Sequence, residues 1–176
     1  MTRRSNITLI GMPGAGKSTL GILLAKALAK DFVDTDVLIQ QRQGCTLQAY
    51  QKAHGLEAFA QLEAEVVGAL TLDNTVISTG GSVVYSREAM SRLAVHSVVV
   101  FIDVPLDVLQ QRIHNMESRG IVQKPGQSFE LLFQERWPLY EAAADIRIEA
   151  DHHAMDAVLA LMIDALSKNH QGTADV

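Results

Sequence analysis

A glycine-rich segment at residues 11–18 constrains the fold more than any other feature of this chain. Its sequence, GMPGAGKS, fits the pattern G-x-x-x-x-G-K-[ST] at every fixed position. The apolar run at 7–10 before it predicts a buried strand, and residues 18–30 after it carry apolar side chains with helical periodicity. A turn between a strand and a helix aims its backbone N–H groups inward, and the helix N-terminus adds positive charge. The segment therefore predicts a phosphate-binding loop.

The side chains of this loop suit a nucleoside triphosphate with a magnesium ion. Lys17 would supply a full charge to the β and γ phosphates, and Ser18 would offer its hydroxyl to Mg²⁺. The alternative is a turn that only connects strand to helix, but a lysine among inward backbone donors would be costly without an anion. The residues expected to bind ATP here are Gly11, Gly14, Ala15, Gly16, Lys17, Ser18 and Thr19.

Short apolar runs alternate with longer helical stretches along the whole chain, which indicates an α/β fold. The expected strands are 7–10, 32–33, 75–78, 97–102 and 146–148. Helices are expected at 18–30, 37–72 with interruptions at Gly44 and Gly55, 86–93, 105–113, 128–144 and 155–166. This order predicts a three-layer α/β/α fold of the P-loop NTPase type with a five-stranded parallel sheet. Ligands of such folds bind at the carboxyl ends of the strands.

Two aspartates, Asp34 and Asp36, follow the second expected strand at that edge. In an extended segment, residues two apart point to the same side, so both carboxylates could face the transferred phosphate. One could hold Mg²⁺ while the other orients the attacking hydroxyl and takes its proton. The alternative is that one of them caps the following helix, where aspartate is favoured, and capping does not preclude catalysis.

Composition narrows the class of protein. The chain has 176 residues, which predicts one domain at 1–168 followed by a disordered tail at 169–176. A net charge of -5 argues against a nucleic-acid partner, and no apolar run is long enough to span a membrane. A single cysteine, Cys45, fits a reducing compartment. We therefore expect a cytoplasmic, monomeric protein whose partner is a small molecule.

Four motifs in order carry a family resemblance: residues 11–18, Asp34-Thr35-Asp36, Ser78-Thr79-Gly80-Gly81 and residues 136–140 (RWPLY). With these motifs the chain resembles the shikimate kinase family over nearly its whole length. The resemblance implies Mg-ATP as the phosphoryl donor and a mobile lid at about 114–126. It also implies that Asp34 associates with Mg²⁺ and that Asp36 binds the acceptor hydroxyl.

Further site residues follow from the same resemblance. Gly80, Gly81 and Arg136 match residues that bind the acceptor, with Arg136 on its carboxylate. Arg112 matches an arginine that lies against the adenine, and Arg119 matches the lid arginine that reaches the phosphates. The alternative for these last two is a solvated surface arginine. Lys17, Asp36 and Arg119 are therefore the expected catalytic residues.

The chain departs from the family pattern around the acceptor. Phe59 is followed by Ala60, where the family has an arginine that grips the acceptor carboxylate, and Glu63 loses that arginine as its partner. Ser82 replaces a third glycine, and the lid sequence is Arg-Gly-Ile-Val at 119–122. The expected reaction is the phosphorylation of shikimate to shikimate 3-phosphate, with Arg136 or another residue compensating. The alternatives are another small hydroxylated acid, a sugar derivative or a nucleotide as acceptor, and a nucleotide-binding switch without an acceptor.

Overall fold

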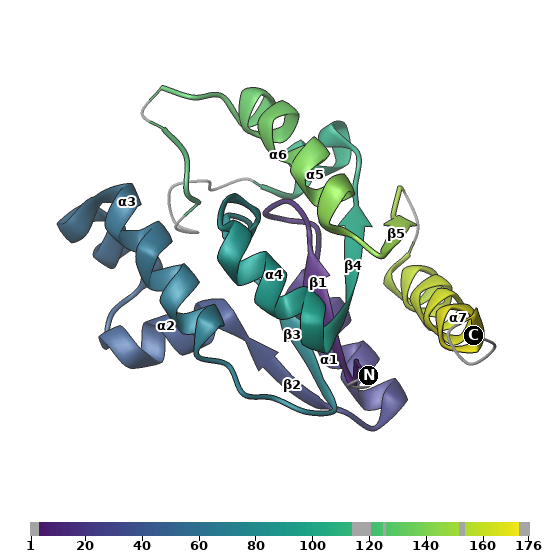
Figure 1. Ribbon diagram of the computed structural model, residues 1–176. Helices are drawn as coiled ribbons and strands as arrows, with labels where there is room; N and C mark the ends of the chain where they lie inside the picture. The colour runs from purple at the N-terminus through teal and green to yellow at the C-terminus, as the bar shows by residue number, and fades with distance from the viewer. Residues whose placement is uncertain (1–3, 114–120, 125, 152–153, 173–176) are drawn as a thin grey trace.

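A five-stranded parallel sheet with the strand order β2-β3-β1-β4-β5 forms the middle layer of the structure (Figure 1). The computed structural model describes residues 4–113, 121–124, 126–151 and 154–172. The five expected strands are all present, and β1 and β4 are buried along their whole length, as strands covered on both faces must be. The strands are β1 (Asn6–Ile10), β2 (Asp31–Asp34), β3 (Thr75–Ser78), β4 (Ser97–Asp103) and β5 (Ile146–Glu149).

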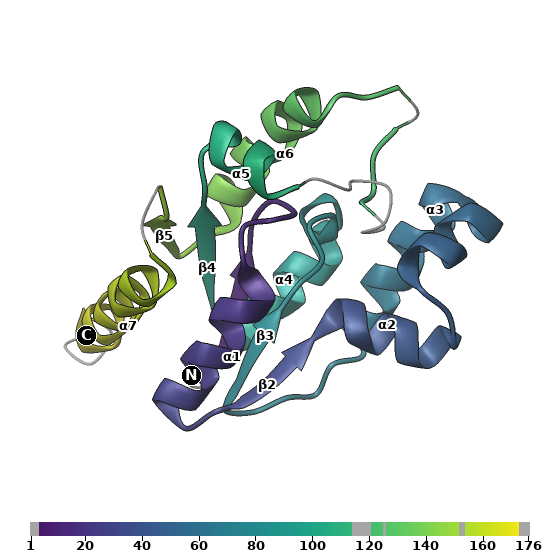
Figure 2. The ribbon, with the colours of Figure 1, turned by 180° about the vertical axis from the view of Figure 1, so that it is seen from behind.

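Helices cover both faces of the sheet, which confirms the expected three layers. Helices α4 and α6 lie on the face toward the viewer in Figure 1, and both contact β4. Helices α1 and α7 contact each other on the opposite face of the sheet, and this face is toward the viewer in Figure 2. The helices are α1 (Lys17–Leu28), α2 (Thr35–Gln43), α3 (Leu47–Gly68), α4 (Arg87–His96), α5 (Leu106–Arg112), α6 (Phe129–Ala143) and α7 (Met155–Gly172), with a 3₁₀ turn η1 at Val83–Tyr85.

The glycines expected to interrupt the long second helical region do so. Gly44 ends α2 in a left-handed conformation with φ 65°, and Gly55 breaks the helical path inside α3 with φ 84°. The Thr46 hydroxyl begins α3 by accepting a hydrogen bond from the Ala49 N–H at 3.2 Å. The helical region ends at Gly68, four residues earlier than expected, whereas α7 continues to Gly172 and so includes the first residues of the expected tail.

Helices α2 and α3 stand beyond the β2 edge of the sheet and have a small core of their own (Figure 1). That core consists of Ile39, Leu47, Phe59 and Val66, and Val122 packs against it. The main core lies between the sheet and the helices on its two faces. The pair α2 and α3 therefore forms a separate wall beside the carboxyl edge of the sheet.

The strand register brings three chain segments together at that edge. Leu9 of β1 pairs with Ser78 of β3, and Ser78 pairs in turn with Asp34 of β2. The strands are parallel, so the residues that follow each of them leave the sheet on the same side. The glycine-rich loop after β1, the aspartates at the end of β2 and the glycines after β3 must therefore meet.

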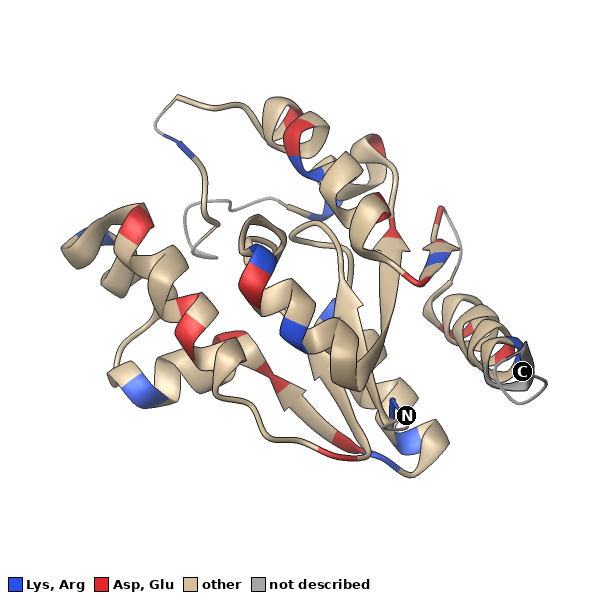
Figure 3. Ribbon diagram, in the orientation of Figure 1, with Lys and Arg blue, Asp and Glu red and all other residues tan. Residues whose placement is uncertain are grey.

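Basic and acidic residues are interspersed over the described part of the chain, as the blue and red segments along α4 show in Figure 3. Helix α4 carries Arg87, Glu88 and Arg92. Within the described part of the chain, no helix combines the length and the apolar character that crossing a membrane requires.

Candidate active site

The glycine-rich loop connects β1 to α1, as predicted. Gly16 precedes the first helical residue with φ 90°, a left-handed conformation that favours glycine, and it offers α1 no capping side chain. The first N–H groups of α1 therefore remain available to a ligand. The Lys17 Nζ donates to the carbonyl oxygens of Gly11 at 2.8 Å and Met12 at 2.9 Å, so the lysine lies inside the curve of its own loop.

Lys17 is buried, with 8% of its surface exposed. Burial lowers the pKa of its ammonium group from 10.5 to about 8, while the nearby Asp36 carboxylate acts in the opposite direction. A cation held away from water gains from an incoming anion, because the anion replaces the lost hydration. The environment of Lys17 therefore favours binding of an anion such as a phosphate group.

Asp34 combines the two roles that the sequence left as alternatives. Its Oδ1 caps α2 by accepting hydrogen bonds from the N–H groups of Asp36 at 3.0 Å and Val37 at 3.4 Å. Its Oδ2 accepts a hydrogen bond from the Ser18 hydroxyl at 2.6 Å. The expectation of an extended segment over Asp34 and Asp36 was wrong, because α2 begins at Thr35 and Asp36 lies in its first turn.

The oxygens of Ser18 and Asp34 fit the expected magnesium ion. Both are hard ligands, and Mg²⁺ usually keeps its waters and takes one or two protein oxygens together with substrate phosphates. No group of three or more His, Cys, Asp or Glu side chains suited to a metal occurs among the residues that the structure describes. The hydroxyl and carboxylate pair at the foot of the loop is consistent with that mode of binding.

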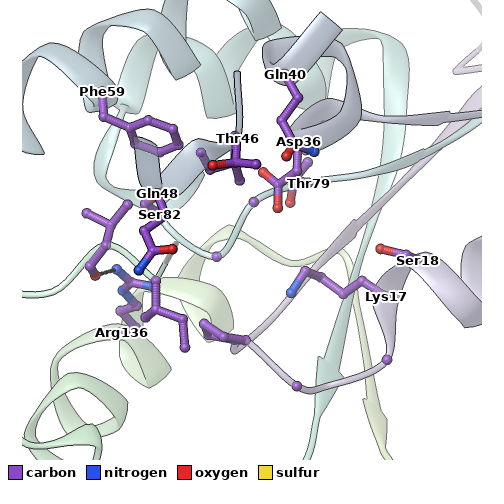
Figure 4. Close-up of a pocket in the computed structure, with 18 of the residues that line it drawn as sticks. Lys17, Ser18, Asp36, Gln40, Thr46, Gln48, Phe59, Thr79, Ser82 and Arg136 are labelled. Atoms are coloured by element: carbon purple, nitrogen blue, oxygen red, sulfur yellow. Dashed lines mark hydrogen bonds between the residues drawn. The ribbon is translucent and has the colours of Figure 1, made fainter. Parts of the chain in front are cut away.

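Asp36 faces Lys17 across the same space (Figure 4). The pKa of its carboxyl group is raised from 3.8 to about 6, mainly by burial and also by the neighbouring Asp34 charge, while Lys17 opposes the change. A carboxylate with a raised pKa is a stronger proton acceptor than an exposed one and is still mostly ionised at neutral pH. Asp36 therefore has the properties of a general base.

A cavity of about 540 Å³ joins these groups. It extends from the glycine-rich loop to α3 and α6, where Arg136 forms part of its wall (Figure 4). Its polar lining includes Gln40, Thr46 and Gln48, which the sequence analysis missed. Gln40 follows Asp36 by four residues on α2, a spacing that places both on one face of a helix and could have revealed it. Thr46 and Gln48 reach the cavity only because α3 begins at its rim.

Gly80 allows two carboxyl groups to approach the turn after β3. A Cβ atom at this position would overlap Glu63 Oε1 and lie 2.8 Å from Asp36 Oδ1, so these two carboxyl groups would have to move. The need for glycine here therefore arises from the protein's own acids as well as from any acceptor. Gly81 is similarly confined, since its Cβ would lie 3.1 Å from Arg136 Nη1.

Ser82, one of the departures from the family pattern, has a clear structural role. Its hydroxyl donates to Glu63 Oε2 at 2.7 Å, while Glu63 Oε1 is buried and has no hydrogen-bond partner among the residues that the structure describes. Burial raises the pKa of Glu63 from 4.5 to about 7, and the Ser82 hydrogen bond opposes this shift. Ser82 thus supplies one of the hydrogen bonds to Glu63 that an arginine at position 60 would have provided.

Arg136 is almost completely buried, with 1% of its surface exposed. Its Nε donates to the Tyr85 hydroxyl at 3.2 Å, and its Nη2 donates to the Val122 carbonyl oxygen. The Tyr140 hydroxyl donates to the Gly81 carbonyl oxygen at 2.5 Å and so ties α6 to the turn after β3. Arg136 is therefore fixed at the end of the cavity away from the first turn of α1.

The remaining predicted residues differ in where the structure places them. Gly14, Gly16, Ser18, Thr19, Gly80 and Gly81 line the cavity, and Gly11 and Ala15 lie buried within the loop. Arg112 is the last residue of α5, is exposed and is not part of the cavity wall. Arg119 lies outside the described residues, as does most of the expected lid. Phe59 lines the cavity but Ala60 does not.

Comparisons with known proteins agree on one family. The family model described as "Shikimate kinase" matches residues 13–167. A shikimate kinase from Pasteurella multocida is 34% identical over 174 residues, covering 97% of this chain and 99% of the relative. Among solved structures, a shikimate kinase from Acinetobacter baumannii in complex with shikimate has a TM-score of 0.86 at 29% identity and covers 93% of each chain. One from Aquifex aeolicus has a TM-score of 0.83 at 33% identity and covers 95% of this chain and 99% of the other.

Proposed function

This chain belongs to the shikimate kinase family, and from that premise we propose that it transfers the γ-phosphoryl group of ATP to a hydroxyl of shikimate. The observation that carries the proposal is that Lys17, Asp36 and Arg136 line one cavity. A cation for the phosphates, a base for a hydroxyl and a second cation for a carboxylate are the three groups that such a reaction needs. The expected products are shikimate 3-phosphate and ADP.

Asp36 accepts a hydrogen bond from the attacking hydroxyl and takes its proton as the oxygen bonds to the γ phosphorus. The bond from that phosphorus to the bridging oxygen breaks, and the electron pair stays on ADP. Lys17 and the free N–H groups of the loop balance the negative charge that develops on the phosphates. Ser18 and Asp34 would hold Mg²⁺, which when bound neutralises charge on the phosphate oxygens.

Arg136 binds the acceptor carboxylate in this proposal. Figure 4 shows the Gln48 side chain directed from α3 toward Arg136, so the amide can supply a second hydrogen bond at that end of the cavity. Arg119 reaches the phosphates from a lid at about 114–126, and Arg112 lies against the adenine. The protein acts as a cytoplasmic monomer with a single kinase domain.

A coupled assay of ADP release tests the proposal directly. The acceptors are shikimate, quinate, gluconate, homoserine and nucleoside monophosphates, each measured with Mg-ATP over the same range of concentrations. Shikimate is expected to give a kcat/KM at least about tenfold above any other acceptor, because a site that pairs a carboxylate discriminates against ligands that leave its polar groups unpaired. Faster turnover of another acceptor would assign the site to that compound instead.

The rate should depend on pH in a bell-shaped manner. The kcat/KM for ATP is expected to fall below pH about 6, where Asp36 becomes protonated, and above pH about 8, where Lys17 of the free enzyme loses its charge. Bound phosphates favour the protonated lysine, so the alkaline limb of kcat should lie at higher pH than that of kcat/KM. Initial rates from pH 5 to 10 measure both limbs. A rate constant that does not change between pH 5 and 7 would exclude Asp36 as the base.

Ala60→Arg should strengthen acceptor binding. Residue 60 comes directly after Phe59, which lines the cavity, and precedes Glu63 by three residues on α3. At this spacing an arginine can pair with the glutamate. A charge-assisted hydrogen bond contributes about 1.5–3 kcal/mol, so the KM for shikimate should fall roughly 10- to 100-fold. Gln61→Arg, which adds the same charge at an exposed neighbouring position, is the matched control. Equal KM values for the two variants would show that position 60 does not address the acceptor.

A further inference from the structure

Tyr85 has no part in the reaction described above, yet it contacts the residue proposed to bind the acceptor carboxylate. It ends η1, the short turn that follows Gly80, Gly81 and Ser82, and its side chain is partly exposed. Its hydroxyl accepts a hydrogen bond from Arg136 Nε at 3.2 Å and donates one to Glu135 Oε1 at 3.0 Å. The guanidinium carbon of Arg136 lies 5.0 Å from the centre of the Tyr85 ring.

These contacts define which edge of the guanidinium group is presented to the cavity. Nε is occupied by Tyr85, and Nη2 by the carbonyl oxygen of Val122. Nη1 lies against Gly81, 3.1 Å from where a Cβ atom would be, and the Tyr140 side chain is a further hydrogen-bond partner of Arg136. The ring of Tyr85 limits tilting of the guanidinium plane, because a cation is attracted to the face of an aromatic ring. Arg136 is therefore held with Nη1 toward the lining of the cavity.

We propose that Tyr85 is a positioning residue for acceptor binding: it orients Arg136 so that Nη1 meets the carboxylate of the acceptor. The inference rests on the proposed role of Arg136. An arginine side chain that is free to rotate would lose conformational entropy each time a carboxylate bound, whereas one already held in place loses little. Glu135 also contributes. It accepts a hydrogen bond from the Tyr85 hydroxyl, which leaves the lone pairs of the hydroxyl oxygen to accept from Arg136.

Tyr85→Phe separates the hydrogen bond from the ring. This variant keeps the aromatic face and removes only the acceptor for Nε, and the exposed position of Tyr85 makes it a mild change to the fold. The KM for shikimate is expected to rise roughly five- to tenfold, with kcat and the KM for ATP within about twofold of the wild type. Tyr85→Leu, which also removes the ring, should raise the KM further. Tyr50→Phe on α3 is the matched control, because the Tyr50 ring lies tilted against His54 and edge-on to Phe59, and Arg136 is not among its described ring contacts.

Two further measurements show whether Tyr85 acts through Arg136. In an Arg136→Lys background, which has no Nε–H to orient, Tyr85→Phe should add little to the KM for shikimate. With the methyl ester of shikimate, which lacks the carboxylate charge, the effect of Tyr85→Phe should also shrink. A merely structural role would predict additive effects in the double variant, together with losses in kcat and in the KM for ATP, and that result would overturn the inference.

The outcomes also separate this inference from the function on which it rests. If Arg136→Lys raises the KM for shikimate but Tyr85→Phe does not, Arg136 binds the carboxylate without help from Tyr85 and only the inference is lost. If Arg136→Lys itself leaves the KM for shikimate unchanged, the proposed role of Arg136 fails and the inference fails with it. Turnover of shikimate by the wild-type protein remains the separate test of the reaction.

Discussion

Lys17→Ala should abolish phosphoryl transfer, with kcat falling by roughly three orders of magnitude or more. Among the described residues, Lys17 is the one side-chain cation inside the curve of the glycine-rich loop, where its Nζ lies 2.8 and 2.9 Å from two loop carbonyl oxygens. The negative charge that develops on the phosphates would then lack the ammonium group that the loop places beside them. Steady-state ADP release with saturating acceptor measures the loss.

Unfolding cannot account for the expected loss. The pKa of Lys17 is lowered from 10.5 to about 8, so its charged form opposes folding at pH 7 when no anion is bound. Removal of this charge in the free variant should therefore offset part of the stability lost with the two hydrogen bonds of the Lys17 Nζ, and the variant should remain folded at the assay temperature. What it should lose is the rise in Tm on adding Mg-ATP, since a ligand stabilises only the state that binds it. Lys26→Ala on the exposed face of α1 is the matched control. Wild-type turnover by Lys17→Ala would refute the assigned role of the loop.

Asp36→Asn should reduce kcat roughly 10²- to 10⁴-fold and leave the affinity for ATP within about twofold of the wild type. An amide can still contact the attacking hydroxyl but cannot take its proton. Asp34 and Ser18 remain in place, because the cap of α2 uses the backbone N–H of residue 36 rather than its side chain. Isothermal titration with ATP and single-turnover kinetics measure the two properties separately. An unchanged rate would exclude Asp36 as the base.

The same substitution should stabilise the fold at neutral and alkaline pH. The folded pKa of Asp36, about 6, lies above its ordinary value of 3.8. Below pH 3.8 the carboxyl group is neutral in both states and has no effect. As the pH rises to 6 the unfolded state releases its proton first, so the wild type loses roughly 3 kcal/mol of stability. Urea denaturation of Asp36→Asn should show this gain at pH 8 and none at pH 3.5. Asp31→Asn, an exposed position on β2, is the control.

Much of the fold follows from local patterns, and these predictions were confirmed. The apolar runs became strands of a parallel sheet, and the glycines at 44 and 55 interrupted the helices where expected. Such features depend on backbone conformation and on burial of one face, which neighbouring residues largely decide. The motif at 11–18 likewise lies between β1 and α1, because a strand, a turn and a helix are consecutive along the chain.

Predictions that depended on the exact start of an element were less secure. The two aspartates were expected in an extended segment, but the Asp34 side chain starts α2 immediately and turns Asp36 into the cavity from a helix. The role of Gln48 could not be predicted from the sequence, because its position relative to Arg136 depends on how α3 packs beside the sheet. Ser82 was identified only as a departure from the family pattern, but its hydroxyl donates a hydrogen bond to the buried carboxyl group of Glu63.

The amino-acid sequence by itself determined the order of strands and helices, the glycine-rich loop and the family, because these depend on periodicity and on residues adjacent in the chain. Tertiary structure alone decided which polar groups share the cavity and how each is charged. Only folding brings the partners of these hydrogen bonds together. Glu63 on α3 pairs with Ser82 in the turn after β3, and Tyr85 of η1 pairs with Arg136 on α6. Burial raises the pKa of the Glu63 carboxyl group and of the Tyr85 hydroxyl group, and that burial does not exist in the unfolded chain.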